Sequence, residues 1–505
     1  MRRTAVLAVA AVLLIPTGGI SAQDADRGPK PPNVVLVMTD DQRYDDMATM
    51  PRTNRFIGDA GVRFRRYFSS YPVCCPARAT VFTGQYAQNH GVRCLYPWCH
   101  GGYGNLNQRN YLPVWLRRAD YVTAHIGKFL NGYGNEKGTP MRPRGWDEWY
   151  GLIDHSTYRM WGYSIFENDH RETYGKVLVR NPRLYQTDVL TNKAVRFIDD
   201  RAGGDKPFFL SVAYLAPHHE SGRTQHLTGQ LVRAAPRHRG RYASQPLPRP
   251  PNYNELNVKD KPPFLGRFNH PITRKREEKI ATRFRERWES LLAVDEGVKR
   301  IIDKLDAEGE LDNTYVIYTS DNGFMQGEHR VRQGKMLPYD ASTHLPFLIR
   351  GPGIPRGRST SAVVGDVDLA ATIVQIASAR PGHALDGRSL LPYARNVRLR
   401  NGRPFLHTTA GQGSHGRTNT REGGARGTEP RVPAWAAVRT SRWLYVSYRS
   451  GHSELYRLQR DPWEMNSLAL DPNYRRQRRT LRRLLGDLKT CRGRSCDKAA
   501  AASVR

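Results

Sequence analysis

The fold of this 505-residue chain is decided by the stretch Asn33–Asp41, which reads NVVLVMTDD. Its apolar residues follow one another without alternation, which is typical of a strand buried on both faces of a sheet. Two adjacent carboxylates, Asp40 and Asp41, come where that strand would end. Ligands of open α/β sheets gather at this edge, and neighbouring acids repel each other unless a cation lies between them. The pair is therefore a candidate cation site, with a solvated strand end as the alternative.

Two later runs have the same buried character, Phe208–Tyr214 and Tyr315–Thr319. Helical periodicity separates the runs, at Tyr185–Asp199 and most clearly at Arg283–Leu305. Because buried strands alternate with helices, the sequence predicts an α/β fold with a large, mostly parallel central sheet flanked by helices.

The run Tyr315–Thr319 also ends in oxygen-bearing side chains, Asp321 and Asn322. Together with Asp40 and Asp41 they offer four hard ligands at two strand ends. Carboxylate and amide oxygens suit Ca²⁺ better than Zn²⁺. This edge of the sheet is therefore a candidate site for a hard cation of this kind.

A second notable stretch is Pro72–Gly84, which reads PVCCPARATVFTG. Pro76 suits the first turn of a helix, and Gly84 suits the residue just past its end. Cys74 would then lie at the positive end of the helix, where an anion is favoured, and Arg78 would add a permanent charge nearby. On spacing alone, an ordinary short helix with two buried cysteines fits equally well.

The segment Cys74–Arg78, followed by Thr83-Gly84, resembles the Cys-x-Pro-x-Arg signature of type I sulfatases. The resemblance implies that Cys74 is converted after translation to formylglycine by a formylglycine-generating enzyme. The hydrated aldehyde would be the nucleophile. The resemblance also implies that this group binds one Ca²⁺ together with Asp40, Asp41, Asp321 and Asn322. Cys75 falls at the variable position, because counting from Cys75 would put the proline and the arginine one residue too close. Ala77 stands where serine is commoner.

Three more elements follow in the order of the same family. Lys128, after a strand that ends in Gly127, resembles the lysine that reaches the sulfate. His218 in Ala-Pro-His would donate to a sulfate oxygen or protonate the leaving alcohol, and Lys335 resembles a second sulfate-binding lysine. His219 and His329 are weaker candidates. A lone lysine or histidine at such places would otherwise be a surface or structural residue.

The segments Gly127–Asn131 and Gly145–Tyr150 resemble the N-acetylglucosamine-6-sulfatase branch of the family. The implied substrate is a 6-O-sulfate on N-acetylglucosamine of a sulfated glycan. An arylsulfatase, or a phosphonate or phosphodiester hydrolase of the same superfamily, is the alternative. Leu130 stands where many arylsulfatases have a histidine, so the proton donor for the leaving group stays open. The resemblance covers residues 33–468 and implies an alkaline phosphatase-like fold.

The N-terminus has the layout of a secretory signal peptide, predicted over residues 1–22. Arg2 and Arg3 precede the apolar run Ala5–Pro16, which is short for a membrane span. We expect a protein without a membrane span that is secreted, periplasmic or displayed at the cell surface. A retained anchor is the alternative.

The chain is long enough for two or three domains. We predict a catalytic domain over residues 30–395 and a C-terminal α+β subdomain over residues 400–505, with a short antiparallel sheet and a basic helix at Arg475–Leu488. Residues 411–427 look like a flap or a linker. Residues 220–275 are rich in arginine and proline, and they could line a cleft for an acidic polymer or form a plain insertion.

The formal net charge is +32, or +30 once the two arginines of the signal peptide are subtracted. Such a field attracts polyanions, including sulfated glycans, acidic surfaces and nucleic acid. An arginine-rich composition without a selected partner is the alternative. Export and the absence of a nucleic-acid motif argue against nucleic acid. A non-enzymatic polyanion-binding protein would explain the charge but not the ligand constellation.

The six cysteines fall into three local pairs. In an oxidising compartment, Cys94 with Cys99 and Cys491 with Cys496 could each close a short disulfide. The first of these pairs, with histidines nearby, could instead be a zinc knuckle, but no second cysteine pair lies at a suitable distance.

Overall fold

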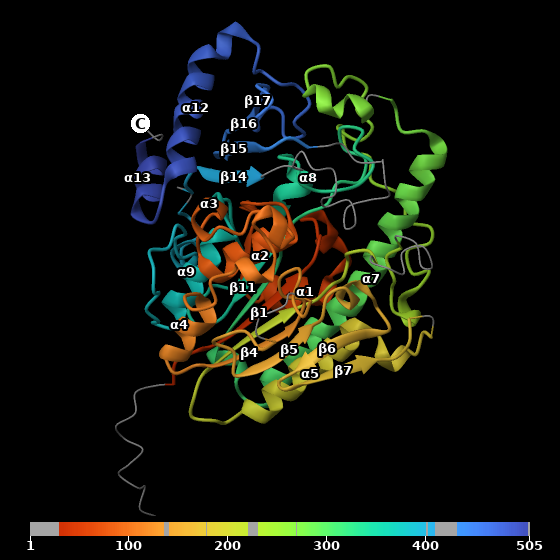
Figure 1. Ribbon diagram of the computed structural model, residues 1–505, viewed down its shortest axis with the longest axis vertical. Coiled ribbons are helices and arrows are strands. Elements are labelled where there is room, and N and C mark those ends of the chain that lie inside the picture. The colour runs from red at the N-terminus through yellow and green to blue at the C-terminus, as the bar shows by residue number, and fades with distance from the viewer. Residues whose placement is uncertain are drawn as a thin grey trace, which may run out of the picture.

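The computed structural model describes the greater part of the chain: residues 30–135, 141–177, 179–220, 231–268, 270–399, 402–409 and 432–502. These residues form a large sheet with helices on both faces and a smaller sheet near the C-terminus (Figure 1). The large sheet has ten strands, in the order β12 (Arg358–Thr360), β2 (Val62–Phe64), β11 (Phe347–Arg350), β9 (Thr314–Ser320), β1 (Asn33–Thr39), β8 (Phe208–Ala213), β4 (Val122–Gly127), β5 (Glu148–Leu152), β6 (Tyr163–Glu167) and β7 (His170–Tyr174).

The centre of the large sheet is parallel. Strands β9, β1, β8, β4 and β5 run in one direction, and β1 lies between β8 and β9. Antiparallel strands β11 on one side and β6 and β7 on the other extend the sheet. The predicted α/β class and the mostly parallel centre are therefore confirmed, and the antiparallel strands lie toward the edges.

Alternate residues of β1 pack on opposite faces of the sheet. Val34 and Leu36 belong to the apolar core under α2, α4 and α9, whereas Val35 and Val37 belong to the core under α5 and α7. Apolar side chains cover the strand on both faces of the sheet. Because no position of the strand faces water, its sequence is an unbroken apolar run. The covering helices are α2 (Cys74–Thr83), α4 (Leu112–Arg118) and α9 (Val367–Ile376) on one face, and α5 (Gln186–Arg201) and α7 (Arg274–Ala307) on the other.

Helix α7 begins at Arg274, nine residues before the predicted start at Arg283. The added turns are largely polar and carry an i,i+4 ion pair between Arg274 and Glu278. Periodic burial starts only near Ile280. Residues with high helix propensity extend α7 on its N-terminal side, beyond the turns that pack against the core. Apolar periodicity therefore could not locate the first residue of the helix.

The smaller sheet is antiparallel, in the order β14 (Phe405–Thr409), β15 (Trp435–Arg439), β16 (Trp443–Tyr448) and β17 (Ser453–Arg457). Helix α12 (Arg475–Thr490) lies beside this sheet and is followed by α13 (Arg494–Ala502), both drawn in blue in Figure 1. Leu481, Leu484, Leu485 and Leu488 are the buried residues of α12. The predicted C-terminal antiparallel sheet is confirmed, while the proposed boundary between residues 395 and 400 stays a prediction.

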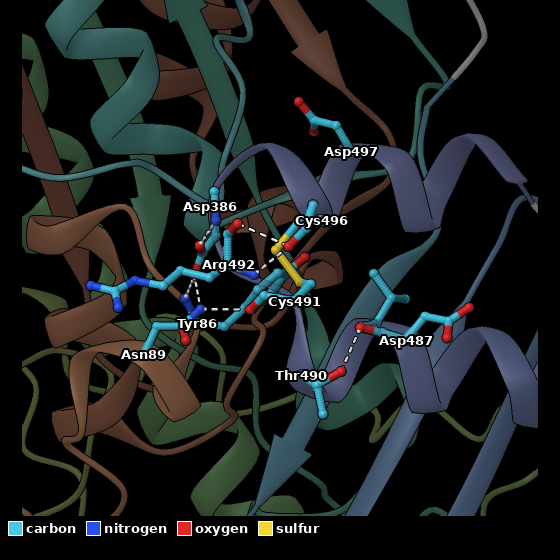
Figure 2. Close-up of a disulfide and its surroundings, with 12 residues drawn as sticks. Tyr86, Asn89, Asp386, Asp487, Thr490, Cys491, Arg492, Cys496 and Asp497 are labelled. Atoms are coloured by element: carbon cyan, nitrogen blue, oxygen red, sulfur yellow. Dashed lines mark hydrogen bonds between the residues drawn. A yellow bond between two sulfur atoms is a disulfide. The ribbon is translucent and has the colours of Figure 1, made fainter.

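Both predicted disulfides are present, Cys94–Cys99 and Cys491–Cys496. Bonding between Cys94 and Cys99 replaces the zinc-knuckle alternative. Figure 2 shows the second disulfide where α12 meets α13. Around it the Gly493 N–H donates to Asp386 (2.7 Å), and the Asn89 amide donates to the carbonyl of Cys491 (2.8 Å). These bonds tie the connection between α12 and α13 to Asp386 and to Asn89 of helix α3 (Ala87–His90).

The remaining α-helices and strands of the described residues are short. They are the helices α1 (Pro51–Thr53), α3 (Ala87–His90), α8 (Asp340–Thr343) and α10 (Leu391–Arg395), and a three-stranded sheet of β10 (His344–Leu345), β3 (Tyr67–Phe68) and β13 (Val364–Gly365). The predicted signal peptide and the segment 411–427 lie outside the described residues. Among the residues that are described, no helix combines the length and the apolar character needed to cross a bilayer.

Candidate active site

Two strand ends meet at the carboxyl edge of the large sheet. Because β1 and β9 are parallel and in register, Asp40-Asp41 and Asp321-Asn322 emerge side by side. The backbone N–H of Asp41 donates to Oδ1 of Asp321 (3.2 Å), and Nδ2 of Asn322 donates to Oδ1 of Asp41 (2.5 Å). Asp41 takes a left-handed conformation (φ 66°), which turns the chain sharply at the strand end. All four side chains are buried.

Helix α2 points its N-terminus at these carboxylates. Val73 is extended, Cys74 is the first helical residue, and Gly84 ends the helix in the left-handed conformation (φ 65°) that the sequence predicts there. The Cys74 thiol donates to Oδ1 of Asp40 (3.2 Å) and accepts from Nζ of Lys335 (2.8 Å). Cys74 is fully buried.

Arg78, one turn further along α2, holds the site together. Its Nε donates to Oδ2 of Asp321 (2.8 Å), and its Nη1 donates to the carbonyl of Lys128 (2.6 Å). Its Nη2 lies 3.4 Å from Oδ2 of Asp40. One guanidinium group therefore connects the ends of β1, β4 and β9. Its several N–H donors, held in one plane, allow it to contact all three at once.

Two lysines complete the charge balance. Lys128 follows β4 and donates to Oδ2 of Asp40, and its Nζ lies 4.5 Å from the centre of the Tyr158 ring. Lys335 donates to Oδ1 of Asp41 (2.6 Å). The two lysines and Arg78 thus face the carboxylates of Asp40, Asp41 and Asp321, so the buried charges are paired.

His218 reaches the cluster from the loop after β8. Its Nδ1 lies 2.7 Å from the carbonyl of His219, which can only accept, so Nδ1 carries a proton. Burial lowers the pKa of His218 well below its ordinary value, so the ring is neutral and Nε2 presents a lone pair. That lone pair faces Oδ2 of Asp41 at 3.6 Å, and neither atom has a hydrogen-bond partner among the described residues.

The carboxylates of the cluster differ in proton affinity. Burial alone would raise the pKa of Asp40, but Lys128 and the other cations around it hold that pKa far below its ordinary value. Burial and the neighbouring charge of Asp40 raise the pKa of Asp321. Burial, with Asp40 beside the sulfur, also raises the pKa of the Cys74 thiol. The cluster thus combines a firmly ionised carboxylate with a more basic one.

The structure brings all the predicted site residues into one connected network. They are Asp40, Asp41, Cys74, Arg78, Lys128, His218, Asp321, Asn322 and Lys335. Ligand atoms of Asp40, Asp41, Cys74 and His218 all lie within 4.8 Å of one another. The geometry thus places His218 beside the predicted oxygen ligands, while Asp321 contacts Arg78.

The weaker candidates lie further out. His219 stacks on His218 with ring centres 4.5 Å apart. His329 contacts Oε2 of Glu255 (2.6 Å) instead of the cluster. Leu130 is 3% exposed and packs in the apolar core, so position 130 supplies no proton donor.

Two contacts were not predicted from the sequence. Tyr158 lies between Lys128 and His218, and its hydroxyl accepts from Nδ2 of Asn131 (2.6 Å). Trp435 of the C-terminal sheet donates to the carbonyl of Met336 (2.8 Å), the residue that follows Lys335. Neither aromatic residue belongs to a recognisable motif, and both come close to the lysines only through the fold.

The chain is similar to several known proteins. A family model described as Sulfatase matches residues 32–379. The chain is 30% identical over 517 residues to N-acetylglucosamine-6-sulfatase of Capra hircus, a match that covers 95% of this chain and 87% of the relative. It is 33% identical over 371 residues to an extracellular sulfatase Sulf-1 homologue of Caenorhabditis elegans, covering 71% of this chain and 48% of the relative. The chain thus spans about half the length of the nematode protein.

Solved structures share the fold. BT4656, solved in complex with its substrate D-glucosamine-2-N,6-O-disulfate, superposes with a TM-score of 0.73 at 22% identity, covering 93% of this chain and 99% of the other. A phosphonate monoester hydrolase from Silicibacter pomeroyi superposes with a TM-score of 0.71 at 23% identity, covering 92% and 96%. Because both kinds of protein have this fold, substrate choice has to be argued from the site.

Proposed function

This chain belongs to the sulfatase family of sulfuric ester hydrolases, and from that premise we propose that it removes the 6-O-sulfate of N-acetylglucosamine in a sulfated glycan. The observation that carries the proposal is the position of Cys74, buried at a helix N-terminus between Asp40 and Lys335. The choice of sugar is supported by the relative from Capra hircus, whose name gives that activity.

We propose that one Ca²⁺ binds at the two strand ends. The residues fit this ion on an observation of the site itself: Oδ2 of Asp41 and Oδ1 of Asn322 are buried acceptors without a partner among the described residues. Asp40, Asp41, Asp321 and Asn322 would hold the ion, with the side chain at position 74 beside them. Oxygen donors of this kind are those that Ca²⁺ prefers. The bound ion would supply a positive charge that polarises the sulfate group.

We also propose that Cys74 is matured to formylglycine by a formylglycine-generating enzyme. The hydrated aldehyde would supply one hydroxyl to attack sulfur and a second to expel sulfate afterwards. In the structure, the Sγ atom marks where the reacting group lies, with Lys335 and Asp40 in contact with it. The raised pKa of Asp321 favours that carboxylate as the acceptor of the nucleophile's proton.

The cations of the site would bind and orient the sulfate. Lys128 and Lys335 can turn from Asp40 and Asp41 toward the sulfate oxygens, while Arg78 keeps the strand ends in place. Positive groups fixed in a buried site stabilise the charge that develops on transfer. Tyr158 lies against Lys128 and limits where its ammonium group can move.

Lys335 is the better candidate for protonating the leaving alcohol. Burial alone would lower its pKa, but Asp41 and Cys74 raise it well above the ordinary value, so the amine carries its proton at neutral pH. A sugar alkoxide is a far stronger base than an amine and would take that proton as the sulfur–oxygen bond breaks. His218 is less suited to this role. Burial lowers its pKa, so the ring is neutral and its Nε2 has a lone pair and no proton to give to the alcohol.

The remaining parts of the proposal concern the whole protein. We propose that residues 1–22 direct export, that residues 30–395 form the catalytic domain, and that residues 400–505 form a subdomain that supports it. The contact of Trp435 with the loop of Lys335 supports this last role. Sulfated sugars, but not nucleic acid, would be the partners of the mature protein.

The adjacent cysteines provide the test. Cys74→Ala should abolish release of sulfate from N-acetylglucosamine 6-sulfate, a loss of at least about a thousandfold, because the nucleophile is removed. Cys75→Ala is the matched control, since Cys75 is equally buried and immediately adjacent. Both variants are produced together with a formylglycine-generating enzyme, and their thermal unfolding is compared. Full activity of Cys74→Ala would refute the proposal.

A panel of substrates separates the alternatives. Rates are compared on N-acetylglucosamine 6-sulfate, an aryl sulfate and a phosphonate monoester. The proposal predicts the highest kcat/KM on the sugar sulfate. A higher value on the aryl sulfate or on the phosphonate would replace it by the arylsulfatase or the phosphonate hydrolase alternative.

A further inference from the structure

A groove of about 600 Å³ lies beside α4, away from the cluster described above. Its lining consists of Arg109, Val114, Arg117, Arg118, Arg144 and Gly145. Four of these six residues are arginines, and they come from α4, from the loop before α4 and from the loop before β5. This arginine groove has no part in the chemistry proposed for the catalytic cluster.

The arginine groove lies toward the amino-terminal ends of the strands. Asp147, just after the Arg144-Gly145 segment, accepts from the backbone N–H of Thr123 near the start of β4 (3.0 Å). Lys128, which belongs to the catalytic cluster, follows the other end of β4. Lys128 is five positions after Thr123 along the extended chain, or roughly 16 Å at about 3.3 Å per residue. Helix α4 itself packs beside β4 (Figure 1).

The charges of the groove are mostly unneutralised. Nε of Arg117 pairs with Oδ1 of Asp147 at 2.9 Å. Within the described residues, no carboxylate contacts the guanidinium groups of Arg109, Arg118 and Arg144, and all three side chains are exposed. Unpaired guanidinium groups around one hollow attract a ligand with several negative charges.

The frame that carries the arginines is fixed by packing. The Tyr111 hydroxyl donates to the backbone carbonyl of Arg144 (2.5 Å), which holds the loop against the start of α4. Gly145 adopts a φ of 86°, and a Cβ at this position would lie 2.6 Å from the backbone nitrogen of Val114. Only glycine fits so close an approach. The groove is therefore formed before any ligand arrives, which lowers the cost of binding.

We propose that the arginine groove is a second glycan site, which binds the sulfate groups of a sulfated oligosaccharide at a distance from the cleaved ester. The choice of ligand rests on the function proposed above. A guanidinium group binds the oxygens of a sulfate in pairs, through parallel N–H donors. Val114, half-buried between the arginines, provides an apolar floor for a sugar ring.

Single-stranded nucleic acid is the polyanion that fits less well. Proteins that bind single strands combine positive charge with aromatic side chains on which bases stack. The residues that line the groove include no aromatic side chain. Sulfate groups on a flexible sugar polymer need only the guanidinium donors.

Binding of a heparin-derived hexasaccharide to the full-length chain tests the proposal. The measurement uses protein that carries Cys74→Ala, so that the ligand is not hydrolysed. Arg109, Arg118 and Arg144 are replaced together by glutamine. The matched control replaces Arg183, Arg356 and Arg449, three exposed arginines from different parts of the surface, and so removes the same charge. Thermal unfolding of each variant shows whether it is folded.

We expect the groove variant to bind the hexasaccharide at least about tenfold more weakly, because three charge-assisted contacts are lost, and the control to change by less than about threefold. An equal loss in both variants would mean that the overall charge attracts the ligand, and no loss in either would mean that the groove is not used. Each result would overturn the proposal. Equal binding of a single-stranded DNA of matched charge, lost in the same variant, would overturn the choice of ligand. If the wild type fails to hydrolyse any sulfated sugar, the proposed function fails, while the binding comparison still decides the groove.

Discussion

Two regions of this protein gather cationic side chains under opposite conditions. In the proposed catalytic cluster, Arg78 is 1% exposed, and it and the two lysines each contact a carboxylate. In the arginine groove the guanidinium groups are exposed, and only Arg117 has a carboxylate contact among the described residues. Burial forces charges to pair because an isolated ion loses its hydration, whereas water tolerates unpaired charges at a surface. Buried cations are therefore suited to chemistry, and exposed ones to attracting a ligand.

The largest expected difference between the regions concerns turnover. Lys335→Ala should lower kcat on N-acetylglucosamine 6-sulfate by about a hundred- to a thousandfold, because a fixed positive group next to the reacting sulfate is lost. It should also lower the melting temperature, since Asp41 loses an ion-pair partner. Arg118→Ala in the groove is the control, and its kcat on the monosaccharide should stay within about threefold, because an exposed arginine far from the ester stabilises no transition state. Similar kcat values for the two variants would remove the distinction between the regions.

A smaller difference is expected in the response to salt. Exposed charges are screened by ions, and buried pairs much less so. Raising the salt concentration from about 50 to about 200 mM should weaken binding of a sulfated hexasaccharide by a factor of ten or more, because counterions compete for the arginines. The kcat on the monosaccharide sulfate should change little. Parallel salt curves for polymer binding and monosaccharide turnover would contradict the separation of the two sites.

A third prediction concerns two carboxyl groups within the buried part of the molecule. Asp366 is buried like Asp40, but its partners are the N–H of Ser70 (2.9 Å) and the hydroxyl of Ser69 (3.2 Å). Burial raises the pKa of Asp366 to about 7, whereas the cations around Asp40 hold the pKa of that carboxyl low. In the unfolded chain both acids titrate near pH 4.

The sign of the effect on stability follows from these values. Asp366 binds its proton more tightly in the folded state, so its contribution to the free energy of unfolding is fully present below about pH 4 and is lost as the pH rises to about 7. Asp366→Asn should therefore flatten the fall in stability over that range, by on the order of a few kcal/mol. Urea unfolding at several pH values measures the slope. Asp487→Asn, an exposed residue of α12, is the control, and equal slopes in wild type and Asp366→Asn would contradict the argument.

The sequence predicted the central strands well because each is buried on both faces. Asn33–Thr39 was expected as a strand and is β1 with the same bounds. The beginning of α7 was not predicted, since its first turns are held by ion pairs and intrinsic propensity and carry no apolar stripe. A strand buried on both faces is recognisable as a continuous apolar run. The exposed turns of a helix have no apolar periodicity by which they could be recognised.

The site residues could be predicted because each stands in a short motif at a strand end or a helix start. The supporting contacts could not. Tyr158 and Trp435 approach Lys128 and the loop of Lys335 from distant parts of the chain, and their role depends on tertiary packing.

The arginine groove also escaped prediction, because it requires Gly145 to bring a loop against α4. The sequence instead offered residues 220–275 as a cleft for an acidic polymer, with a plain insertion as the equal alternative. In the described part of that segment, Arg237 pairs with Asp188 (2.6 Å) and Glu296 (2.7 Å), and Arg249 pairs with Glu277 (2.6 Å). Arginines that are already neutralised have less to offer a polyanion, and sequence composition does not reveal the pairing.

The central claim is that the side chain at position 74 reacts as an aldehyde hydrate within the buried cluster. Mass spectrometry of the tryptic peptide Tyr67–Arg78, taken from enzyme of known specific activity, tests it most directly. We predict a peptide in which the CH₂SH group of residue 74 is replaced by CHO while Cys75 keeps its thiol, in a fraction that rises with specific activity. A fully active preparation in which residue 74 is still a thiol would contradict the account.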